Sequence, residues 1–164
     1  MPAGCCDALL MPRLGSFDES FFDTAPHRWA RSWDVPAPAD DFWAGFVDRP
    51  LHWCRALRIE WTSERPFGVG ATRTVTVLHT LRGVEQFFLW EEGRRQAFHF
   101  TRANLPGLRR FGEYYDIEPT GAGSCRFTWK LAAEPTTAGK AAVPALHLLV
   151  ANLYGDTTRH FAST

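Results

Sequence analysis

The middle of the chain is a series of short segments in which apolar and polar side chains alternate. Alternation with a period of two is typical of strands that bury one face. Tight turn signals such as Arg82-Gly83 and Glu92-Gly93-Arg94 separate these segments. Strands joined by turns this short predict an antiparallel meander. We expect six strands, at residues 57–62, 71–79, 84–91, 95–102, 110–118 and 124–132.

Three further elements are expected before the meander. Residues 27–35 alternate in the same way and predict a first strand. Residues 38–48 place aromatic side chains such as Phe42 and Phe46 on one helical face, which indicates a short amphipathic helix. Proline is tolerated at the first helical position, so Pro50 predicts a second short helix over residues 51–56.

The pattern returns to helix after the meander. Residues 141–161 carry one apolar stripe, and we expect a long helix there that Gly155 weakens or bends. Residues 1–26 show neither a helical nor a strand periodicity. We therefore expect an N-terminal extension that is partly disordered or packed over the domain through Phe17, Phe21 and Phe22. The domain proper is then residues 27–164.

Composition excludes several classes of protein. The 164 residues suit one domain, and 18 Lys and Arg balance 18 Asp and Glu, whereas nucleic-acid-binding proteins carry an excess of positive charge. No apolar run approaches the roughly 20 residues of a membrane span, and no secretory signal is visible.

The four cysteines have no disulfide-framework spacing, which favours a reducing compartment, and we expect a cytoplasmic protein. No Cys-x-x-Cys or His-x-x-x-His spacing indicates a metal, so we expect neither a metal nor a cofactor.

The order of elements resembles the helix-grip domain of the START-related superfamily, which includes polyketide cyclases and lipid-transfer domains. The motifs that carry the resemblance are residues 35–39 with Phe42-Trp43, residues 68–73, Glu85 with Trp90, and residues 114–119. The resemblance implies an α+β helix-grip fold, in which a seven-stranded curved antiparallel sheet wraps around the long C-terminal helix. It also implies a cavity between sheet and helix that holds a hydrophobic small molecule.

Strand alternation predicts which side chains point into that cavity, because alternate residues of a strand face the same side. Both frames of the strand at 84–91 are mostly apolar, and the resemblance favours Glu85, Phe87 and Leu89 inward. The predicted ligand-binding residues are Arg31, Arg73, Val75, Glu85, Phe87, Phe98, Glu113, Tyr115, Phe127, Trp129, Leu149 and Leu153.

Four of these residues are ionisable: Arg31, Arg73, Glu85 and Glu113. Isolated buried charges are costly, so these groups must form pairs or shift their pKa values. One interpretation is ion pairs that brace the sheet, and we expect Arg73 to pair with Glu85. The other is the polar end of a ligand pocket that orients a carbonyl, phenol or carboxylate. A carboxyl whose pKa is raised could act as general acid or base, which makes Glu85 and Glu113 weak candidates for catalysis.

Three functions remain open from the sequence. The first is binding or transport of an aromatic or lipid-like small molecule, which requires a cavity of roughly 300 Å³ or more. The second is a polyketide cyclase- or dehydratase-like enzyme that uses a buried carboxylate. The third is a structural or interaction protein whose own aromatic side chains fill the core. The expected partners are a hydrophobic ligand and, because edge strands can pair, at most a second copy of the chain in a homodimer.

Overall fold

The computed structural model describes residues 11–163. Its elements, in chain order, are α2 (Phe21–Thr24), β1 (His27–Val35), α3 (Ala39–Asp48), β2 (Leu57–Trp61), β3 (Thr72–Val77), β4 (Leu81–Glu91), β5 (Arg95–Ala103), β6 (Leu108–Gly121), β7 (Ser124–Pro135), η1 (Ala138–Ala142) and α4 (Val143–Ala162). None of the helices within these residues is both long and apolar enough to cross a bilayer.

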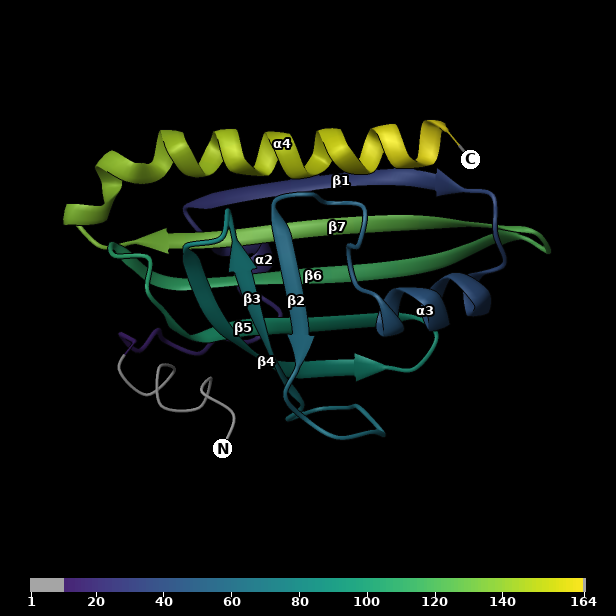
Figure 1. Ribbon diagram of the computed structural model, residues 1–164, viewed down its shortest axis with the longest axis horizontal. Coiled ribbons are helices and arrows are strands. Elements are labelled where there is room, and N and C mark those ends of the chain that lie inside the picture. The colour runs from purple at the N-terminus through teal and green to yellow at the C-terminus, as the bar shows by residue number, and fades with distance from the viewer. Residues whose placement is uncertain (1–10, 164) are drawn as a thin grey trace.

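The seven strands form one antiparallel sheet with the order β1-β7-β6-β5-β4-β3-β2. The first strand therefore lies beside the last, and β1 and β2 form the two edges. The 20-residue helix α4 runs along the sheet beside β1 (Figure 1). Helix α3 lies over the same face of the sheet, near the C-terminal end of α4. The predicted helix-grip fold is confirmed.

One of the predicted helices is wrong. Residues 51–56 form successive turns, in which Leu51 adopts a φ of 50° and its carbonyl accepts a hydrogen bond from the Cys54 N–H. A six-residue helix gains few hydrogen bonds for the cost of its nucleation, whereas the turns bury both Leu51 and Cys54. The long helix, by contrast, continues without interruption through Gly155, because its buried face packs on the sheet on both sides of that residue.

The inward frame of β4 changes within the strand. Glu85 and Phe87 face the main core as predicted, but the pairing with β5 shifts register between Phe87 and Leu89. A bulge adds one residue to one strand and reverses the faces that follow it. Trp90 therefore packs on the main core, and Leu89, which was expected inward, packs on the opposite side of the sheet.

The N-terminal segment covers the outer face of the sheet, which points away from α4. Phe21 and Phe22 are buried there against Ala97, Tyr114 and Ala132. Backbone hydrogen bonds from residues 14 and 15 to β5 and to β6 attach the preceding stretch to the same sheet. Residues 1–10, which belong to the predicted extension, lie outside the described residues.

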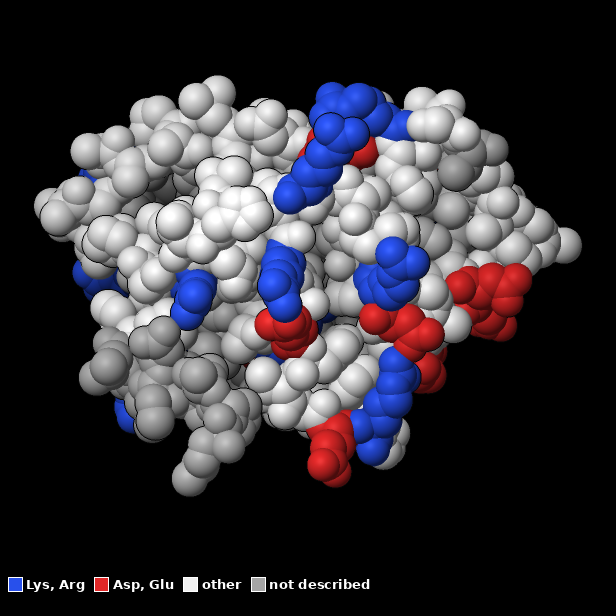
Figure 2. Space-filling view, in the orientation of Figure 1, with Lys and Arg blue, Asp and Glu red and all other residues white. Residues whose placement is uncertain are grey.

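Charged side chains of opposite sign lie next to each other over much of the surface. Figure 2 shows several Lys and Arg side chains beside Asp and Glu. One such surface pair joins Arg58 to Glu60 at 2.8 Å. The part of this face over the first half of α4 shows almost no charge, because residues 141–151 contain no Asp, Glu, Lys or Arg.

Candidate ligand cavity and its buried polar cluster

The inward-facing residues meet beneath α4 and enclose a cavity of about 50 Å³. The predicted residues that line it are Val75, Glu85, Glu113, Tyr115, Leu149 and Leu153. The sequence therefore places the correct strand faces and the correct helix face around one internal space.

The cavity is much smaller than the roughly 300 Å³ expected of a ligand site. The predicted lining residues Phe87, Phe98, Phe127 and Trp129 are at most 1% exposed and fill the core. Phe46 of α3 adds to this packing, since its ring lies 4.9 Å from that of Tyr115 and 5.2 Å from that of Phe127, measured between centroids. The aromatic side chains thus occupy most of the space that the fold encloses.

A second hollow of about 170 Å³ opens to the surface where the β3–β4 turn, the β5–β6 loop and the start of α4 come together. Its lining is apolar and includes Leu78, Leu81, Leu105, Pro106, Leu146 and Leu149. Leu146 and Leu149 also line the internal cavity, so the two spaces adjoin across these two side chains. We call the surface hollow the mouth. Its turn and loop residues are not among the predicted ligand-binding residues, and an available signal was that the apolar Leu81 and Leu105 lie between predicted strands.

A buried ion pair braces the sheet beside the cavity. Arg73 and Glu85 are direct neighbours in the β3–β4 register, and the Arg73 Nε–H donates a hydrogen bond to Glu85 Oε2. The two side chains are 0% and 2% exposed, so the predicted pair is confirmed. Burial by itself would lower the pKa of the Arg73 guanidinium, but the Glu85 carboxylate, together with Tyr115 and Glu113, more than offsets burial and raises this pKa.

Aromatic rings surround the rest of the guanidinium. Its central carbon lies 4.7 Å from the ring centroid of Phe98, 5.0 Å from that of Phe87 and 5.4 Å from that of Trp61. Its two terminal nitrogens have no hydrogen-bond partner among the described residues. Cation–π attraction therefore compensates in part for the water that this charge has lost.

Glu113 is the second buried carboxyl of the cavity. Its Oε2 accepts hydrogen bonds from the Tyr115 hydroxyl at 2.6 Å and from the Trp129 indole N–H at 2.8 Å. Burial, together with the nearby Glu85 carboxylate, raises the pKa of Glu113 to about 7. Near neutral pH this group can therefore either donate or accept a proton at the cavity wall.

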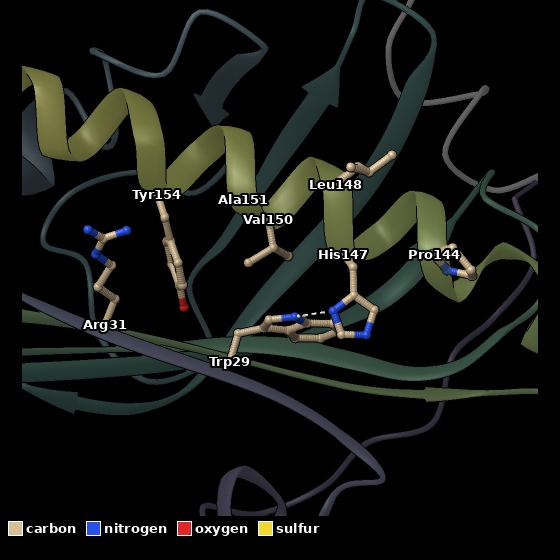
Figure 3. A pocket seen from close by; sticks show the side chains of 8 residues that line it. All are labelled: Trp29, Arg31, Pro144, His147, Leu148, Val150, Ala151 and Tyr154. Carbon is tan, nitrogen blue, oxygen red and sulfur yellow. Dashed lines mark hydrogen bonds between the residues drawn. The ribbon is translucent and has the colours of Figure 1, made fainter.

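Arg31 does not join the other three ionisable residues. It lies in an open groove of about 840 Å³ between β1 and α4, together with Trp29, His147 and Tyr154 (Figure 3). The side chain is exposed because β1 is an edge strand whose inner face α4 covers only in part. The predicted group of four charges is therefore a buried group of three.

The comparisons with known proteins agree with this architecture. The sequence model of the family described as polyketide cyclase / dehydrase and lipid transport matches residues 26–164, and the chain belongs to this family. An uncharacterized protein of Mycobacterium tuberculosis is 32% identical over 117 residues, which cover 69% of each chain. An uncharacterized protein of Mycobacterium bovis is similar to the same extent.

Solved structures show the same fold at low sequence identity. A START superfamily protein from Mycobacterium smegmatis has a TM-score of 0.58 at 14% identity, covering 81% of this chain and 98% of its own. A truncated norcoclaurine synthase from Thalictrum flavum has a TM-score of 0.60 at 16% identity, covering 79% of this chain and 89% of its own. At these identities the likeness extends to the fold alone.

Proposed function

We propose that the protein binds a hydrophobic small molecule between the sheet and α4, and that the ligand enters through the mouth. The observation that carries this proposal is the continuity of the apolar lining. Leu146 and Leu149 line the mouth on one side and the internal cavity on the other. The passage leads to Glu113, which together with Glu85 and Tyr115 forms the polar part of a lining that is otherwise apolar.

The ligand needs more room than the two spaces provide, since both lie below the roughly 300 Å³ of ordinary ligand sites. Leu146 and Leu149 would therefore move outward when it binds. Both belong to the first turns of α4, where Leu148 lines neither the mouth nor the internal cavity and is exposed. An outward shift of this end of the helix would break the apolar contacts of these two leucines and the 2.9 Å hydrogen bond from the Trp29 N–H to His147. The proposal is therefore binding by local opening of the helix start.

The test fills the passage with a larger side chain. Leu149→Trp places an indole between mouth and cavity, and Leu148→Trp is the matched control because Leu148 is 68% exposed on the outer side of the same turn. The probe is N-phenyl-1-naphthylamine, an uncharged apolar dye that becomes fluorescent when it leaves water. We expect Leu149→Trp to weaken dye binding at least tenfold and Leu148→Trp to leave it unchanged.

Native mass spectrometry before and after organic extraction provides the second measurement. A mass that falls to that of the bare chain on extraction would show a retained ligand. Absence of dye binding to the wild-type protein, combined with the bare mass before extraction, would refute the proposal and favour a closed core without a ligand.

Glu113 supports a second candidate function, an enzyme of the cyclase or dehydratase type. A carboxyl that lines the cavity, is fixed by two hydrogen bonds and has a pKa of about 7 can transfer protons at neutral pH. Glu113→Gln tests this function against a poly-β-keto substrate. Unchanged substrate affinity with lost turnover would support catalysis, whereas unchanged turnover would exclude Glu113 as the acid or base.

A further inference from the structure

A third hollow lies at the other end of α4, on the surface. It has a volume of about 390 Å³ and is formed by the loop after β1, by α3, by the turns at residues 52–53 and by the last turn of α4. Its side chains include Phe42, Arg49, His52, Trp53, His160 and Phe161. In the described chain it shares no lining residue with the mouth or with the internal cavity, and unlike them it has the volume of an ordinary ligand site.

One wall of this hollow is a fixed aromatic surface. The Trp53 indole stacks on the His160 imidazole, with centroids 4.6 Å apart and planes 9° apart, and it lies 5.3 Å from the Phe161 ring. The Trp53 N–H donates a hydrogen bond of 2.9 Å to the Thr157 hydroxyl, which holds the indole in this orientation. A planar ring can therefore pack here without reordering the protein.

The hollow also has basic side chains beside this aromatic wall. Arg49 is exposed and forms no ion pair with any residue of the described chain, although many arginines of this protein pair with a carboxylate. His52 holds its Nδ1 at 3.1 Å from the Arg49 carbonyl oxygen, and its ring lies 5.6 Å from that of His160. Asp41, the acidic residue of the lining, lies in the first turn of α3, about two helical turns before Arg49, which directly follows the helix.

We propose that this hollow binds a planar aromatic anion, whose ring packs on Trp53 and Phe161 and whose anionic group is bound by Arg49 with His52 and His160. A guanidinium binds carboxylate and phosphate oxygens through paired N–H donors, and an imidazole beside it adds a donor when its free ring nitrogen carries a proton. The aromatic wall selects the ring, and the basic groups select the charge. This site is independent of the proposed ligand cavity beneath α4.

The test is a titration of the ¹⁵N-labelled full-length protein with 1-naphthoate, followed through the Trp53 indole N–H signal. The uncharged 1-naphthamide has the same ring and is the ligand control. Arg49→Gln removes the proposed anion contact, and Arg55→Gln removes an exposed arginine of the adjoining turn that does not line the hollow.

We expect 1-naphthoate to shift the Trp53 signal and the amide to bind at least tenfold more weakly. Arg49→Gln should weaken naphthoate binding about tenfold, as expected for the loss of a charge-assisted hydrogen bond, and Arg55→Gln should not change it. Leu149→Trp should also bind naphthoate normally, which separates this site from the internal cavity.

The proposal is overturned if Arg49→Gln binds naphthoate as tightly as the wild-type protein, if the amide binds equally well, or if the shifts occur at Trp129 in the core instead of at Trp53. A parallel titration with 1-naphthyl phosphate identifies the source of the anionic group. Tighter binding of the phosphate would assign an aromatic phosphate ester, and tighter binding of naphthoate would assign an aromatic carboxylate.

Discussion

Replacing Glu113 by Gln should change how the stability of the protein depends on pH. The glutamine resembles the protonated carboxyl in shape, and its side-chain oxygen can still accept the hydrogen bonds from Tyr115 and Trp129. It cannot ionise. The difference in free energy of unfolding between the variant and the wild-type protein therefore isolates the titration of one buried group.

The magnitude follows from the pKa of Glu113. In the folded protein burial raises it from its ordinary value of 4.5 to about 7. Between these two pH values the folded protein retains a proton that the unfolded chain has lost, so rising pH favours the unfolded chain. Each pH unit corresponds to about 1.4 kcal/mol, which gives a loss of about 3 kcal/mol by the time the folded group has ionised.

The assay is urea unfolding of both proteins from pH 4.5 to 8, followed by tryptophan fluorescence. Near pH 4.5 the two proteins should have similar stability. As the pH rises, Glu113→Gln should become progressively more stable than the wild-type protein, by about 3 kcal/mol at pH 8. Glu64→Gln, at an exposed position, is the control and should stay within about 0.5 kcal/mol of the wild-type protein at every pH. A difference between Glu113→Gln and wild type that stays constant with pH would refute the reasoning, because it would mean that Glu113 titrates equally in both states.

The packing makes three further predictions, each measured by urea unfolding at pH 7. Arg73→Met leaves Glu85 buried without its partner and should cost about 3–5 kcal/mol, most of which the additional change Glu85→Leu should restore. Phe22→Ala should cost about 3 kcal/mol, because it removes a buried ring from the outer face of the sheet. Gly83→Ala should cost about 1–3 kcal/mol, since its methyl group would overlap the Phe100 ring.

Each of these has an outcome that contradicts it. A loss below about 1 kcal/mol for Arg73→Met would show that the ion pair is not structurally required. An unchanged stability for Phe22→Ala would mean that the N-terminal segment does not stabilise the sheet. Gly123→Ala is the control for Gly83→Ala, because an added Cβ there meets no atom within 4 Å. Equal stability of the two alanine variants would contradict the predicted clash.

The sequence by itself determined the order of the elements and, for most strands, which side chains face the core. Residues 27–35 form the first strand as predicted, and Arg73, Glu85 and Glu113 face the core. These features depend on the alternation of side chains between the two faces of a strand, which is a local property of the chain. The bulge in β4 could not be predicted, because both of its frames are apolar and the choice depends on contacts with other elements.

The tertiary structure alone decided the size of the cavity, the exposed position of Arg31, and the existence of the mouth and of the surface hollow beside Trp53. The mouth joins turn leucines to α4, and the hollow joins Trp53 to His160, which lie far apart in the sequence. The volume between such residues depends on how closely whole elements pack. Periodicity shows which face of an element is buried, but it contains no information about the distance to the element packed against it.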